Sequence, residues 1–90
     1  MRRLSFDIFC RVVDNFGDIG VCWRLARQLA RTSGANAVRL WVDDLHSFAR
    51  IEPKLGCRVN PEPLDGVDIV HWTSPAPDLT PHEVVIEAFA

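Results

Sequence analysis

The sequence predicts an α/β domain built on a parallel sheet. The pattern of its apolar runs indicates this class, and its composition and the lengths of these runs indicate a folded protein that does not span a membrane. Short runs of β-branched and aromatic residues alternate with one longer run of helical periodicity. The 90 residues are 48% hydrophobic and 24% charged, which is the composition of an ordinary folded protein. No apolar run approaches the roughly 18 residues that a membrane-spanning helix needs. We therefore expect one small domain or a piece of a larger one.

The first part of the chain predicts a strand, a turn-rich loop and a helix. The strand is expected at residues 6–13, and residues 14–18 form the loop. The helix is expected to begin near Asp18 or Ile19 and to end at residues 32–34, where a glycine provides a natural stop. Its inward side chains follow the 3.6-residue period. They are Cys22, Leu25, Ala26, Leu29 and Ala30.

The second part predicts strands, one short helix and a long loop. Three strands are expected, at residues 38–42, 67–72 and 84–89. A helix capped by Asp44 should run to residue 49 or 50. Three prolines and two glycines make residues 53–66 a loop, with at most a short extended piece at 57–59.

This order of elements is typical of a Rossmann-like half, a parallel sheet with flanking helices. The last residues form an apolar strand with no following turn or polar tail. We therefore expect the chain to be the first part of a larger domain.

Charge and cysteine content exclude several function classes. The net charge of −2 argues against a general nucleic-acid binder, although residues 60–90 carry six acids and no Lys or Arg. The three cysteines lack a C-x-x-C spacing, and the three histidines have no ligand spacing with them. We therefore expect no metal, no membrane association and a reducing cytoplasm, with Cys10 and Cys22 as small core residues.

The loop between the first strand and the first helix is the candidate ligand site. Ligands of open parallel sheets gather at the carboxyl ends of the strands, and Gly17 would let the backbone approach a ligand closely. Asp14 and Asp18 flank the loop. A carboxylate at a helix N-terminus stays ionised, so this pair suits a cationic acceptor better than an anion. The structural alternative is a turn-forming Asp14 and a helix-capping Asp18.

Other residues have two readings each. Asp43 or Asp44 could mimic the ribose-binding acid of a dinucleotide site, or could simply close a strand and cap a helix. The three tryptophans are expected in the core or at a domain interface. A row of arginines on the first helix is either a solvated face or a surface for an acidic partner. This row consists of Arg24, Arg27 and Arg31.

Several motifs in order along the chain resemble one enzyme family. They are DIFC at 7–10, VVDNFGDIGV at 12–21, WRLARQL at 23–29, VRLWVDDL at 38–45 and VVIEAFA at 84–90. This order is similar to the amino-terminal segment of elongation factor P arginine rhamnosyltransferases. The resemblance implies a two-domain, GT-B-type, inverting enzyme that transfers rhamnose from dTDP-β-L-rhamnose to an arginine of elongation factor P, without metal or cofactor. Residues 1–90 would form part of the acceptor-side domain and lack the donor-binding domain, so we expect no activity from this chain alone.

The resemblance also implies roles for the loop residues. Asp18 matches the acid proposed as the catalytic base, and Asp14 matches the second acid of the loop. Asn15, Phe16 and Gly17 match positions beside the donor substrate, with Phe16 in place of a frequent tyrosine. Two alternatives remain from the residues themselves: another nucleotide-sugar or pyruvyl-type transferase, and a non-catalytic α/β module or fragment that only contacts elongation factor P.

Overall fold

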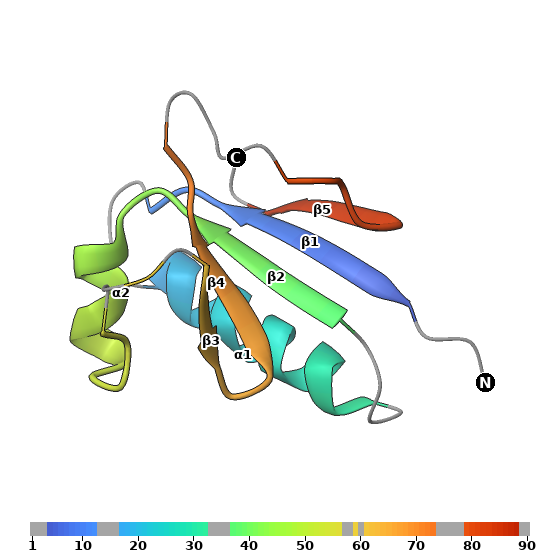
Figure 1. Ribbon diagram of the computed structural model, residues 1–90. Helices are drawn as coiled ribbons and strands as arrows, with labels where there is room; N and C mark the ends of the chain where they lie inside the picture. Colours follow the sequence, from blue (N-terminus) through green and yellow to red (C-terminus); the bar gives the residue numbers. More distant parts are fainter. Residues whose placement is uncertain are drawn as a thin grey trace.

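A computed structural model describes residues 4–12, 17–32, 37–56, 59, 61–73 and 79–88, except for the side chains of Asp18 and Ala88. One sheet has the strand order β3-β4-β2-β1-β5. Its strands are β1 (Ser5–Cys10), β2 (Ala37–Val42), β3 (Glu62–Leu64), β4 (Val67–His71) and β5 (Val84–Ala88). The helices are α1 (Gly17–Arg31) and α2 (Leu45–Ile51). The predicted α/β class is therefore confirmed (Figure 1).

Strand β3 corrects the expectation of a loop over residues 53–66. It pairs antiparallel with β4, and the turn between them contains Asp65 at φ 51° and Gly66 at φ 82°. Two positive φ values in a two-residue turn fit the type I′ hairpin, which Asp-Gly favours. The sheet is therefore mixed, whereas an all-parallel sheet was predicted. Val59 lies outside any strand, and residues 57 and 58 are not among those described.

The other elements lie close to their predicted positions. Strand β1 is shorter than expected, because it ends at Cys10, and residues 11 and 12 continue without regular structure. Helix α1 begins at Gly17, one residue before the predicted start. Asp44 caps α2, as predicted, by accepting a hydrogen bond from the Ser47 N–H.

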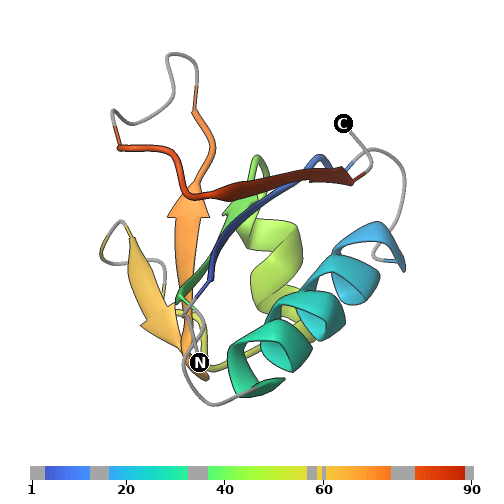
Figure 2. The same cartoon turned by 90° about the vertical axis from the view of Figure 1, so that its right-hand side faces the viewer.

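Both helices cover the same face of the sheet (Figures 1 and 2). The flanking helices that the sequence predicted thus share one face. The five residues predicted as the inward stripe of α1 all belong to the resulting core or pack against it. The core also contains alternate residues of the strands, as the pleat of a sheet requires. From the sheet these include Ile8, Cys10, Leu40, Val42, Val67 and Ile69.

The chain changes direction in the sheet after β4. Strands β2 and β4 extend the sheet on one side of β1, whereas β5 pairs with β1 on its other side. Parallel crossovers are right-handed, and this rule predicts a β4–β5 connection on the face opposite to the helices. A hydrogen bond from the His82 N–H to Asp7 ties this connection to the sheet on that face. Strands β1 and β5 thus form a topological switch point.

Candidate functional site

The candidate loop connects two elements at the carboxyl edge of the sheet. Strand β1 ends at Cys10 beside the switch point, and α1 begins at Gly17. Gly17 and Asp18 are the first two residues of α1. Asp14, Asn15 and Phe16 lie outside the described residues, as does the side chain of Asp18. The described backbone thus places Cys10 and Gly17, which flank the loop, at the edge where open α/β sheets bind ligands.

The start of α1 is fixed against the sheet by packing. Ile19 and Cys22 are fully or almost fully buried in the core. Trp23 is also buried, and its ring meets the ring of Phe48 of α2 edge-on at 5.2 Å. Asp18 precedes the first of these anchors by one residue, so its backbone position depends on the same packing.

A hydrogen bond joins the other end of the loop to the neighbouring strand. The N–H of Val12 donates to Oδ1 of Asp43 at 2.8 Å. Asp43 directly follows β2, and the side chain of Val12 packs against the core. The sequence analysis missed this contact. An acid placed directly after a strand was the available signal, but its partner depends on which strands are neighbours.

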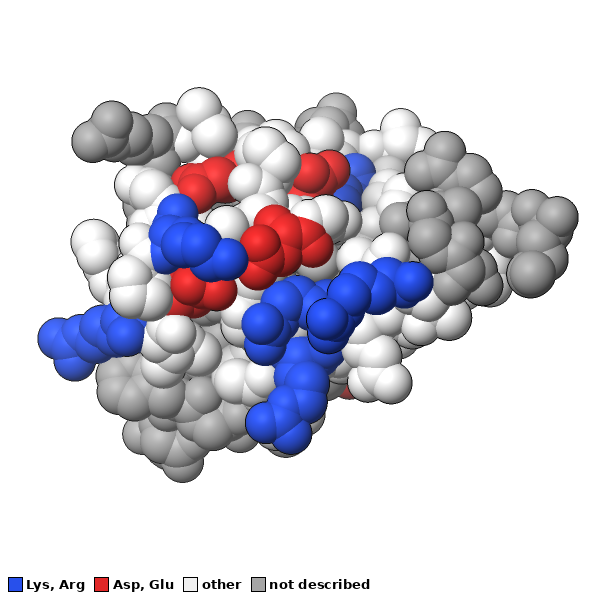
Figure 3. All heavy atoms as spheres, turned by 90° about the horizontal axis from the view of Figure 1, so that it is seen from below, with Lys and Arg blue, Asp and Glu red and all other residues white. Residues whose placement is uncertain are grey.

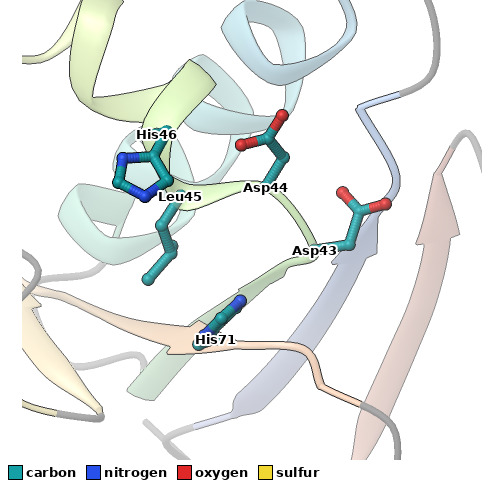
Figure 4. A pocket seen from close by; sticks show the side chains of 5 residues that line it. All are labelled: Asp43, Asp44, Leu45, His46 and His71. Carbon is teal, nitrogen blue, oxygen red and sulfur yellow. The ribbon is translucent and has the colours of Figure 1, made fainter.

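A recess of about 240 Å³ lies at the same edge, beyond β2 and β4 (Figure 4). Asp44 is one of its walls, and its carboxylate also accepts from the Ser47 hydroxyl at 2.7 Å. This bond and the one from the Ser47 N–H lower the pKa of Asp44 below its ordinary value. Of its two predicted readings, the structure thus supports the helix cap. The recess is lined by Asp43, Asp44, Leu45, His46 and His71.

The histidines do not join a metal-binding cluster in the part of the chain that the structure describes. No group of three or more His, Cys, Asp or Glu side chains there has the geometry to hold a metal ion. His46 and His71 share the recess, whereas His82 lies near the opposite end of the sheet, with Nδ1 2.9 Å from the carbonyl oxygen of Phe6. The recess therefore offers imidazole and carboxylate groups for polar contacts.

A second hollow, of about 290 Å³, lies on the face without helices. It is lined by Asp7, Phe9, Trp41, Leu79, Pro81, Val85 and Glu87. Phe9 and Trp41 stack there with ring centroids 4.9 Å apart. Asp7 is only 2% exposed. Burial by itself raises the pKa of this carboxyl, but hydrogen bonds from Arg39, the His82 N–H and Trp41, with the Arg39 charge, bring the pKa below its ordinary value. The Asp7 carboxylate thus joins the sheet to the β4–β5 connection.

The structure shows where the three tryptophans lie and gives a packing contact for one arginine of α1. Trp23 and Trp41 are buried, as expected for core residues, whereas Trp72 is half-buried beneath the Arg11 guanidinium at 4.9 Å. Basic side chains gather on the helix side of the molecule (Figure 3). On α1, Arg27 lies over the Trp23 ring at 4.8 Å. This arginine is therefore partly a packing residue.

Comparison with known proteins decides the family. A family described as elongation factor P (EF-P) rhamnosyltransferase EarP matches residues 6–90. The chain belongs to the EarP family. A protein-arginine rhamnosyltransferase of Pseudomonas aeruginosa is 56% identical over 86 residues, which are 96% of this chain and 23% of that protein. Proteins of the same name from Pseudomonas putida and Shewanella oneidensis are 50% and 52% identical, over 98% and 94% of this chain.

The EarP match confirms the resemblance that the sequence motifs indicated. The chain spans less than a quarter of the length of these relatives, 23% in both Pseudomonas proteins and 22% in the Shewanella protein. Their names describe a transferase that modifies arginine in a protein. Neither helix among the described residues is long and apolar enough to cross a membrane.

Proposed function

We propose that residues 1–90 form the acceptor-side segment of a protein-arginine rhamnosyltransferase. The observation that carries this proposal is the family match over residues 6–90, together with 56% identity to the Pseudomonas aeruginosa relative. The acceptor is an arginine of elongation factor P, and the donor is dTDP-β-L-rhamnose. The complete enzyme has the GT-B arrangement, with a second domain that binds the donor. It inverts the configuration at the anomeric carbon and works in the cytoplasm.

The acids of the β1–α1 loop hold the acceptor guanidinium. A guanidinium keeps its proton below a pH of about 12, and an ordinary Asp is ionised above a pH of about 4. Asp14 and Asp18 therefore bind a cation as a pair of anions, and neither deprotonates free arginine to a useful extent. Their first task is to localise the charge and to aim one nitrogen at the anomeric carbon. Asn15, Phe16 and Gly17 contact the donor substrate.

Proton transfer follows the formation of the new bond. The guanidinium nitrogen forms a C–N bond to the anomeric carbon while the C–O bond to the nucleotide breaks, and the nucleoside diphosphate leaves with that electron pair. The acidity of the attacking nitrogen rises as its bond forms, so its proton passes to Asp18 at that stage. In this step Asp18 takes up the released proton, and the nucleoside diphosphate carries away the electron pair of the broken bond. We assign the step no metal or other cofactor.

A chimera tests whether residues 1–90 can replace the matching segment of an active rhamnosyltransferase. Residues 1–90 replace the matching segment of the Pseudomonas aeruginosa relative, and the product is incubated with elongation factor P and dTDP-β-L-rhamnose. We expect a deoxyhexose on arginine, detected by mass spectrometry, and none with the 90-residue chain alone. A folded chimera without transfer, beside an active parent enzyme, contradicts the proposal.

The same assay separates the alternatives. A donor screen that includes other nucleotide sugars and a pyruvyl donor distinguishes another transferase from a rhamnosyltransferase. A chimera that binds elongation factor P with the parent's affinity but transfers nothing identifies these residues as a non-catalytic binding module.

A further inference from the structure

We propose that Asp43 is a positioning residue for the loop that carries Asp14 and Asp18. This inference rests on the proposed function and adds a residue outside the loop itself. Its basis is the 2.8 Å hydrogen bond from the Val12 N–H to Oδ1 of Asp43, which crosses from the end of β1 to the end of β2. Val12 stands two residues before Asp14 in the chain.

Asp43 is a fixed acceptor because both of its neighbours in the chain are anchored. Val42 is fully buried, and its carbonyl oxygen accepts the Trp72 N–H at 2.8 Å. Asp44 caps α2 through its side chain. The backbone of Asp43 is thus held between a core strand and a helix start. Its carboxylate cannot follow a movement of the loop without disturbing one of these two elements.

The two ends of the loop are therefore fixed by different means. Gly17 opens α1, whose next residues Ile19 and Cys22 are buried in the core. Val12 has both its side chain and its amide engaged, the side chain by the core and the amide by Asp43. Only residues 13–16 lie between these two ends. Removing the Asp43 carboxylate releases the amide of Val12, the last described residue before the loop.

This role differs from that of the other carboxylates at this edge. Asp44 turns its oxygens to Ser47, within its own helix cap. Asp43 instead bonds to a residue 31 positions earlier in the sequence. A carboxylate that accepts from a backbone N–H can be replaced by an amide oxygen, since both accept hydrogen bonds. Asp43→Asn should therefore keep the contact, and Asp43→Ala should lose it.

The first arm of the test uses the 90-residue chain. We expect the Val12 amide in Asp43→Ala to exchange its hydrogen at least about tenfold faster than in the wild type, and Asp43→Asn to restore slow exchange. The matched control is Glu62→Ala, which removes another carboxylate that accepts a backbone N–H, that of Gly56 at 2.7 Å. The control should leave the exchange of Val12 unchanged. Unchanged exchange of Val12 in Asp43→Ala overturns the proposal.

The second arm uses the chimera with the Pseudomonas aeruginosa relative. We expect Asp43→Ala to lower kcat about tenfold with KM within about threefold, because misplaced reacting groups cost rate more than binding. Asp43→Asn should retain nearly the full kcat, and Glu62→Ala should behave as the wild type. Equal losses in the Asn and Ala variants overturn positioning by a hydrogen bond.

The two proposals fail in different ways. An inactive wild-type chimera contradicts the proposed function, while the exchange experiment on Val12 still decides whether Asp43 holds the loop. An active wild-type chimera with an equally active Asp43→Ala variant contradicts the positioning role alone.

Discussion

Arg39 and Asp7 form a two-pronged ion pair across neighbouring parallel strands. Arg39 Nε lies 2.6 Å from Oδ1 of Asp7, and Nη2 lies 2.9 Å from Oδ2. The same carboxylate accepts from Trp41 Nε1 at 3.1 Å and from the His82 N–H at 2.9 Å. One buried carboxylate thus joins β1, β2 and the crossover that leads to β5.

Removal of Arg39 should destabilise the domain strongly. Arg39→Met leaves the Asp7 carboxylate buried without a compensating charge, and loss of one partner of a buried pair costs about 3 kcal/mol. The free energy of unfolding, measured by urea denaturation of the 90-residue chain, should fall by that amount. The control is Lys54→Met, which breaks the exposed pair with Asp65 at 3.0 Å. This control should stay within about 0.5 kcal/mol of the wild type, and an equal loss in both variants would refute the buried pair as the cause.

The Asp7 carboxylate should make the free energy of unfolding of the chain fall at low pH. The pKa of Asp7 is lower in the folded state than its ordinary value, so the folded state binds fewer protons than the unfolded state at low pH. Stability from this group is complete above a pH of about 4 and is lost as the pH falls through the lower, folded-state pKa. Asp7→Asn should therefore give a shallower fall in the free energy of unfolding between pH 5 and about pH 2. A fall as steep as that of the wild type would assign the loss of stability at low pH to other groups, such as Asp44.

Much of this fold could be predicted from local patterns. The spacing of apolar residues predicted α1 and its buried side, and β-branched runs predicted four of the five strands. The Asp65–Gly66 pair between Leu64 and Val67 was a readable hairpin signal for β3, but the prolines nearby outweighed it in the sequence analysis. Proline at position 63 is compatible with β3 because the strand is at the edge of the sheet.

The contacts that organise the candidate site depend on strand order and register. Asp7 meets Arg39 because these two residues are paired in the register of β1 and β2. Asp43 meets Val12 because the two strands are neighbours with the same direction. Neither fact follows from periodicity, which predicts a strand without naming its neighbours. The choice of the loop acids used only local patterns around β1 and α1, and their roles stay predictions.

Two glycine substitutions, one in the β3–β4 turn and one in α1, should have opposite effects on stability. Gly66 has φ 82°, a conformation that costs an L-residue about 1 kcal/mol or more, and an added Cβ would lie 3.7 Å from Cβ of Ala30. Gly66→Ala should therefore destabilise the chain by about 1 kcal/mol. Gly20 is helical, and an added Cβ there meets nothing within 4 Å. Gly20→Ala should stabilise by about 0.5 kcal/mol, since alanine loses less entropy in a helix. Thermal unfolding of both variants checks the signs, and a stabilising Gly66→Ala would contradict the turn.

Replacement of Asp18 tests the acid that receives the proton. Asp18→Asn keeps the size of the side chain at the second position of α1, so the fold and the unfolding temperature should change little. The amide can neither pair with the guanidinium charge nor accept its proton, and loss of general-base function commonly costs at least about a hundredfold in rate. In the chimera with the Pseudomonas aeruginosa relative, kcat for rhamnose transfer should fall by that factor. The control is Asp68→Asn on β4, whose exposed side chain lies away from the loop and should leave kcat unchanged. Near-normal turnover by Asp18→Asn would remove this residue from the reaction and leave Asp14 as the acid to examine.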